Sequence, residues 1–296
     1  MNAAEIQVVD ACCNEPFQGS PTGVVLDAKM LKDDVMQLIA SEMHLPVTAF
    51  NLGGNEDNLH IRFFCPTSEL QFSAHGAVAM FTALTLAEKI KPPKKLNLLT
   101  RIGKLAVEIT PKENSPVEIA VTLPAPKYRD FGYSIELLAG ILGTDRYSIP
   151  TPRPMGLVSV GAWTLVVPIT TKEELEEVHP DYDSLNRLNQ KLGAVSTLLY
   201  SWNSPTDIIC RTFAPASSIP EDPVTGEAIA AAASLIVKEG AVETTPPKTV
   251  IQATQGANLG RPSQVTLEVN HDQEGINSAR LIATAEKTME GKIRLP

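Results

Sequence analysis

The residues whose types and spacing best suit catalysis lie in the stretch 211–237, where a strand runs into an acidic turn and a helix start. Asp222 stands directly before Pro223, and a residue before proline is biased toward extended backbone, so the helix is predicted to begin just after this turn. A carboxylate beside the free N–H groups of a helix start lies where an anionic substrate and proton transfer can meet. The alternative is that Asp222 only caps the helix.

A similar stretch occurs 149 residues earlier, because Arg62-x-Phe64-x-Pro66 repeats in Arg211-x-Phe213-x-Pro215. Each copy is followed by a turn and a helix rich in small residues, the first beginning near His75 and the second near Gly226. The same context in each half predicts an internal duplication. Two similar halves should place the two helix N-termini in comparable positions.

The strands and helices expected around these residues indicate an α+β fold. Leu96 to Thr100 and Leu105 to Ile109 flank a glycine turn, and similar hairpin signals recur along the chain. They predict mixed or antiparallel sheets around one long helix per half. The linker is predicted at Pro124-Ala125-Pro126, which gives an N-terminal domain of residues 1–123 plus 277–296 and a C-terminal domain of residues 124–276.

The composition and charge of the chain exclude several classes of binding partner. The 296 residues carry a formal net charge of −9, which argues against nucleic acid or an anionic membrane as partner. The start has no signal-peptide pattern, and no run of about 18 apolar residues occurs, so the expected location is the cytoplasm. Five scattered histidines and four cysteines show no metal-ligand spacing, so no metal is expected and the thiols should be reduced and mostly buried.

Several motifs, in this order, resemble the PhzF-like (phenazine biosynthesis-like) family of the diaminopimelate-epimerase fold. They are Asp10-Ala11 with Pro16-Phe17-x-Gly19-x-Pro21, Thr48-Ala49-Phe50, Arg62-x-Phe64-x-Pro66-Thr67-x-Glu69 before His75, Arg211-x-Phe213-x-Pro215, Glu221 to Gly226, and Gln255-Gly256 with Gly260-Arg261-Pro262. The resemblance implies two pseudo-symmetric domains, each a curled mixed or antiparallel sheet around a central helix, with the active site in the cleft between them.

The resemblance also implies cofactor-independent isomerase or epimerase chemistry on a small anionic metabolite, such as a biosynthetic intermediate, by proton transfer at carbon next to a carboxylate. His75 and Asp222 match the family positions for proton exchange. Backbone N–H groups at the two helix starts would stabilise the charge that develops on the substrate. Those helix starts supply the expected substrate-binding residues Ser73, Ala74, Gly76, Thr225 and Gly226.

Some positions depart from the family pattern. Val47 stands where the family has an acidic residue, the expected general acid/base, immediately before Thr48-Ala49-Phe50. Glu227 replaces a serine after the Thr-Gly pair, and the cysteine pair of diaminopimelate epimerases is absent, which argues against two-thiol chemistry. Glu227 could restore the missing carboxylate to the cleft as a relocated base, could repel an anionic substrate there, or could simply point to water from the first turn of its helix.

Three functions follow from these alternatives. The first is an isomerase that works with His75, Asp222 and Glu227. The second is a family member that has lost the usual chemistry at Val47 and serves as a binding or scaffold protein. The third keeps the cleft but performs a cyclase-type or lyase-type reaction. An exposed sheet edge in either domain would permit a homodimer.

Overall fold

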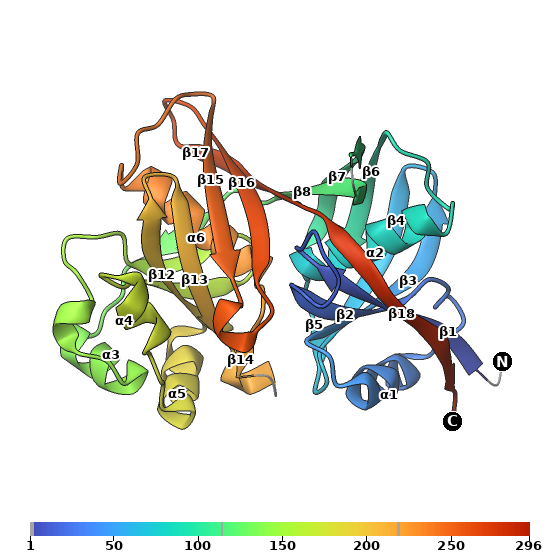
Figure 1. Cartoon of the computed structure of the whole chain (residues 1–296), viewed down its shortest axis with the longest axis horizontal. Helices are drawn as coiled ribbons and strands as arrows, with labels where there is room; N and C mark the ends of the chain where they lie inside the picture. The colour runs from blue at the N-terminus through green and yellow to red at the C-terminus, as the bar shows by residue number, and fades with distance from the viewer. Residues whose placement is uncertain (1–2, 114, 218–219) are drawn as a thin grey trace.

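A computed structural model describes residues 3–113, 115–217 and 220–296, and it has the expected α+β architecture (Figure 1). The strands are β1 (Ala3–Ala11), β2 (Ser20–Val25), β3 (Val47–Asn55), β4 (Asn58–Phe64), β5 (Glu69–Leu70), β6 (Lys94–Thr100), β7 (Gly103–Lys112), β8 (Ser115–Leu123), β9 (Lys127–Arg129), β10 (Gly156–Ser159), β11 (Trp163–Pro168), β12 (Ser196–Ser204), β13 (Asp207–Phe213), β14 (Glu221–Asp222), β15 (Lys248–Gln255), β16 (Ser263–His271), β17 (Ile276–Ala283) and β18 (Ala285–Arg294). The helices are α1 (Asp33–Met43), α2 (Ala74–Leu86), α3 (Ile135–Leu142), α4 (Lys172–Glu176), α5 (Tyr182–Leu192) and α6 (Gly226–Lys238).

The strand pairings of the first half recur in the second. β2 runs parallel to β3, β3 pairs antiparallel with β4, and β4 runs parallel to β6, which continues through β7 to β8. The corresponding order in the second half is β11, β12, β13, β15, β16 and β17, with the same parallel and antiparallel relations. This repetition confirms the pseudo-symmetric, mixed-sheet fold.

One buried helix stands at the centre of each half. α2 and α6 are each 13 residues long, and every residue from Ala74 to Leu84 in α2 is buried. α2 contacts β1, β2, β3, β8 and β18, whereas α6 contacts β10, β11, β12, β15, β16 and β17. We call these two groups the N-terminal lobe and the C-terminal lobe (Figure 1). Alanine is the most frequent residue in both helices, so strands can pack closely around them.

The repeated Arg-x-Phe text has the same structural role in both lobes. Arg62 donates two parallel hydrogen bonds to Glu69, from Nε and Nη2, both at 2.7 Å. Arg211 donates the same pair to Glu221 at 2.8 and 2.9 Å. Each guanidinium also lies over the phenylalanine two residues later, as the repeat places it. These bidentate pairs fix β5 against β4 and β14 against β13.

The end of the chain connects the lobes. β17 pairs with β16 and with β8, and β18 then pairs along β1, so the C-terminal strand returns to the first half as expected. This strand spans Ala285–Arg294. The domain boundaries at residues 123 and 277 stay a prediction. No described helix is long and apolar enough to cross a membrane.

A second connection between the lobes is an ion pair. Arg261, between β15 and β16, reaches Asp10 at the end of β1 with Nη2 2.7 Å from Oδ1. Its Nε donates to the Gly19 carbonyl at 2.8 Å. Asp10 is almost completely buried and also accepts the Phe17 N–H at 2.7 Å. Arg261 therefore holds the loop before β2 against the end of β1.

Candidate functional site

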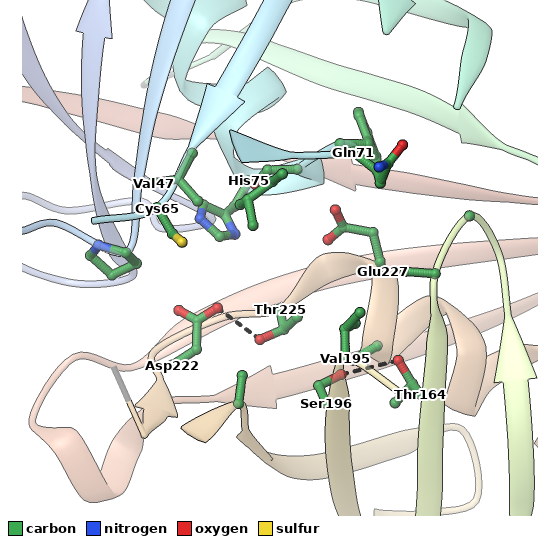
Figure 2. Close-up of a pocket in the computed structure, with 18 of the residues that line it drawn as sticks. Val47, Cys65, Gln71, His75, Thr164, Val195, Ser196, Asp222, Thr225 and Glu227 are labelled. Atoms are coloured by element: carbon green, nitrogen blue, oxygen red, sulfur yellow. Dashed lines mark hydrogen bonds between the residues drawn. The ribbon is translucent and has the colours of Figure 1, made fainter. Parts of the chain in front are cut away.

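A pocket of about 160 Å³ lies between the lobes, where the N-termini of α2 and α6 meet (Figure 2). Most of its wall is apolar, and a few polar groups converge on it, which is typical of small-molecule sites. The lining residues are Pro46, Val47, Cys65, Leu70, Gln71, Phe72, Ser73, His75, Ile102, Gly161, Ala162, Thr164, Val195, Ser196, Ala214, Asp222, Thr225, Glu227 and Ala228.

Many residues that line the pocket occupy corresponding positions in the two lobes. Because α2 begins at Ala74 and α6 at Gly226, the second residue of each central helix is titratable, His75 in one and Glu227 in the other. The sequence had aligned His75 with Gly226 as the two helix starts, whereas in the structure Ala74 corresponds to Gly226, a difference of one residue. Three further corresponding pairs also line the pocket, namely Leu70 with Asp222, Cys65 with Ala214, and Val47 with Ser196. The pocket is thus built by equivalent positions of two lobes.

Glu227 points into the pocket and not to water (Figure 2). Its Oε1 accepts the backbone N–H of Ala74, the first residue of α2 in the other lobe, at 2.9 Å. Burial raises the pKa of Glu227 to about 7, and the charge of Asp222 adds to this shift. The solvent-facing alternative for Glu227 is therefore wrong. A carboxyl group with this pKa exists in both protonation states at neutral pH, which suits acid–base chemistry.

Asp222 is held by the turn that the proline pattern predicted. It lies in β14, and its carboxylate accepts the Thr225 hydroxyl at 2.8 Å and the Val224 N–H at 3.3 Å. Its backbone carbonyl accepts Gln255 Nε2 at 2.7 Å. Burial raises the pKa of Asp222, although the neighbouring His75 and the hydrogen bonds from Thr225 and Val224 oppose that shift. The side chain lines the pocket, so its contacts are not limited to the helix cap that was the alternative.

His75 lies at the back of the pocket with only 3% of its surface exposed. Among the described residues, neither of its ring nitrogens has a hydrogen-bond partner. Burial lowers the pKa of His75, although the negative charge of Asp222 opposes the shift. The ring is therefore neutral at physiological pH, with one N–H donor and one acceptor nitrogen. A buried polar group without a partner requires an explanation, and a bound ligand supplies one.

The predicted substrate-binding residues fall into two groups. Ser73 and Thr225, which precede the helices, line the pocket. Ser73 caps α2 by accepting the Gly76 N–H at 3.1 Å, whereas the Thr225 hydroxyl donates to Asp222 and leaves α6 without a side-chain cap. The start of α6 therefore lacks the side-chain cap that the start of α2 has.

Ala74, Gly76 and Gly226 do not belong to the described lining. Ala74 meets the pocket through its N–H, which Glu227 already occupies. Both glycines serve close packing, because an added Cβ would press on Phe63 at Gly76 and on Leu281 at Gly226. Substrate binding by these three residues stays a prediction.

Cys65 is a lining residue that the sequence reasoning missed. The four cysteines were compared with the cysteine positions of diaminopimelate epimerases, and none matched. The missing signal was the register of the hairpin around residues 53–58, which pairs Thr48 with Phe64 and so brings Val47 and Cys65 to the same end of the strand pair. Within the described part of the chain, no three His, Cys, Asp or Glu side chains gather in a way that could hold a metal ion.

Curated relatives are similar to this chain over most of its length. An uncharacterised isomerase of Deinococcus radiodurans is 29% identical over 96% of this chain and 92% of its own. A trans-2,3-dihydro-3-hydroxyanthranilate isomerase of Pseudomonas fluorescens is 28% identical over 86% of this chain and 87% of its own.

Solved structures agree in fold. A PhzF-family phenazine biosynthesis protein of Bacillus anthracis aligns with a TM-score of 0.87 and 25% identity over 99% of both chains. A probable proline racemase of Agrobacterium radiobacter aligns with a TM-score of 0.71 at 11% identity, over 99% of this chain and 93% of its own, and shows the shared fold alone. The family model for phenazine biosynthesis-like proteins (PhzC-PhzF) matches residues 9–291. The two curated relatives above are named as isomerases, and the chain belongs to the phenazine biosynthesis-like family.

Proposed function

We propose that this protein is a cofactor-independent isomerase or epimerase that moves a proton at a carbon next to the carboxylate of a small metabolite, in the pocket between the lobes. The relatives from Pseudomonas are named for trans-2,3-dihydro-3-hydroxyanthranilate, an unsaturated acid with an amino group. An unsaturated amino or hydroxy acid is therefore the substrate class to test first. A cytoplasmic location and a homodimer are parts of the same proposal.

The observation that carries this proposal is the set of titratable groups brought to one pocket by distant parts of the chain. Glu227 and Asp222 come from the C-terminal lobe, and His75 from the N-terminal lobe. Burial raises the pKa values of both carboxyl groups, that of Glu227 to about 7, and lowers that of the imidazole. A carboxyl group whose pKa lies near the operating pH can both accept and return a proton.

Each group has a distinct use in this reaction. Glu227 can take a proton from substrate carbon in its carboxylate form and return it in its acid form. Negative charge then spreads onto the substrate carboxylate, where the uncapped N–H groups of α6 and a neutral His75 can donate hydrogen bonds. Asp222, held by Thr225 and Val224, supplies a second proton-exchanging group beside the ring.

Solvent-deuterium incorporation tests the proposal directly. The protein is incubated in deuterated buffer with a panel of unsaturated amino and hydroxy acids, and label at the carbon next to the carboxylate is measured by mass spectrometry and NMR. Exchange should occur for at least one acid and fall about 100-fold or more in Asp222→Asn and His75→Ala, since acid–base groups contribute on the order of 100- to 10,000-fold. The exposed Glu243→Gln is the matched control. Exchange that survives in both site variants would remove the site assignment.

One observation favours the second candidate, a non-catalytic binding protein. The Glu227 carboxylate already occupies the Ala74 N–H, so a negative charge of the protein lies where a substrate carboxylate would be received. In that case neither the wild type nor any of these variants should show exchange, and Glu227→Ser should create or strengthen binding of small carboxylates, measured by calorimetry. If Glu227 is instead a proton carrier, Glu227→Ser abolishes exchange even where binding improves.

A further inference from the structure

Position 47, which lacks the acidic residue of the family pattern, has a neighbour just past the end of the next strand. β3 and β4 pair antiparallel with Thr48 opposite Phe64, so Val47 at the start of β3 and Cys65, which directly follows β4, lie at the same end of the strand pair. Both side chains line the pocket, and Figure 2 shows Cys65 beside Val47 with its sulfur directed toward the space below His75.

Cys65 differs from the other three cysteines of the chain. Its Sγ lies 3.4 Å from the Thr67 hydroxyl and 3.5 Å from the Ser68 hydroxyl. Burial by itself would raise the thiol pKa, but these hydroxyl groups and the backbone N–H groups of Thr67 and Ser68 outweigh it and lower the pKa of Cys65. A lowered thiol pKa increases the fraction of thiolate, which is the reactive form.

The pKa values of the other three thiols shift in the opposite direction. Burial raises the pKa of Cys13 to about 11 and raises those of Cys12 and Cys210 as well. None of these three belongs to the described lining of the pocket. The chain therefore combines thiolate stabilisation and access to the pocket in one cysteine.

A second, independent feature of the pocket indicates that its N-terminal side receives a ligand. Only 3% of the surface of His75 is exposed, and neither ring nitrogen has a hydrogen-bond partner within the described part of the chain, although the ring faces the pocket beside Cys65 (Figure 2). Across the pocket stand the other titratable groups, Asp222 and Glu227. No lysine or arginine is found among the described lining residues, so only these four groups set the local charge.

We infer that Cys65 is the proton-carrying catalytic residue of the N-terminal lobe, in place of the acid missing at Val47. This inference rests on the proposed function. The Cys65 thiolate takes the proton from substrate carbon and becomes a thiol, while the acid form of Glu227 gives its proton to the substrate and becomes a carboxylate. The product has the same atoms as the substrate. Exchange with solvent resets both groups, and the reverse reaction uses them in opposite roles.

Thiol labelling tests this inference without any substrate. Native protein is treated with iodoacetamide between pH 6 and 9, and modification of each cysteine is followed by peptide mass spectrometry. Cys65 should be labelled at least about ten times faster than Cys12, Cys13 and Cys210, which react after unfolding, because only Cys65 meets the pocket with a stabilised thiolate. Labelling of Cys65 no faster than of Cys210 in the native protein overturns the inference.

Exchange kinetics test the catalytic step. Cys65→Ser should lower kcat about 100-fold with little change in KM, since a serine hydroxyl holds its proton too tightly to serve as the base. Cys210→Ser, a buried cysteine in the core of the C-terminal lobe, is the matched control and should keep wild-type kcat. Adding Val47→Glu to Cys65→Ser should recover exchange, because a carboxylate then returns to the neighbouring position.

The two proposals fail in different ways. Exchange at the wild-type rate in Cys65→Ser contradicts the role of Cys65 and leaves the isomerase proposal standing. If the wild type exchanges no acid of the panel, the isomerase proposal is contradicted, and the proton-transfer role of Cys65 fails with it. Selective labelling of Cys65 in that case would still assign a reactive thiol to this pocket. Unselective labelling contradicts the inference whether or not exchange occurs.

Discussion

Glu227→Gln offers a test in which stability and activity should change in opposite directions. Gln keeps an oxygen that can accept the Ala74 N–H but removes the negative charge from a site that disfavours it. Burial raises the pKa of Glu227 from 4.5 to about 7, a difference equivalent to ~3 kcal/mol between its protonation states. Because part of the side chain stays exposed, we expect about 2 kcal/mol of this to be realised in stability.

The sign follows from proton linkage. Between pH 4.5 and about 7 the folded protein binds more protons at Glu227 than the unfolded chain does, so the free energy of unfolding falls as pH rises through this window. The Gln variant lacks this fall. It should match the wild type at pH 4.5 and exceed it at pH 8, with a melting temperature about 4–6 °C higher for a chain of this size.

Urea and thermal unfolding at pH 4.5, 6 and 8 measure this difference, and the exposed Glu243→Gln is the control for a neutralised glutamate. The same Glu227→Gln protein should have lost deuterium exchange. The reasoning is refuted if Glu227→Gln is no more stable than the wild type at pH 8, or if its gain is the same at every pH. Either result would mean that the Ala74 N–H and the helix ends stabilise the charged form, and that Glu227 is a structural anchor between the lobes.

Three further substitutions test how the lobes hold the site. Arg261→Ala leaves Asp10 buried without its charged partner and should lower the free energy of unfolding in urea by about 2–4 kcal/mol; a loss below about 0.5 kcal/mol, typical of surface pairs, would contradict this. Gly226→Ala forces a methyl group against a buried leucine and should cost about 1–3 kcal/mol in the same assay; an unchanged unfolding midpoint would show that the helix ends have room. Gln255→Ala removes the donor to the Asp222 carbonyl, so kcat for exchange should fall by a larger factor than KM changes. A loss of stability without any change in kcat would limit Gln255 to a structural role.

Local patterns in the sequence were sufficient for most of the architecture. The R-x-F repeat predicted a duplication that the structure confirms in matched strand pairings and in matched arginine–glutamate pairs. The proline after Asp222 predicted the extended turn that is now β14, and small residues predicted the two central helices. These features depend on backbone preference and on periodicity, which neighbouring residues determine. Family membership followed from the order of such motifs.

The chemistry of the pocket depended on contacts that no local pattern contains. The Ala74 N–H and Glu227 are separated by 153 residues, and only the packing of two helix ends decides that the glutamate faces the cleft and not the solvent. Its pKa follows from that burial, as do those of His75 and Asp222. The pairing of β3 with β4 likewise decides that Cys65 and Val47 lie at the same end of the strand pair. The sequence alone determined which proton-carrying residues the chain contains, whereas the tertiary structure decided which of them lie in the same pocket. The physical reason is that side-chain direction and desolvation are set by segments far apart in the chain.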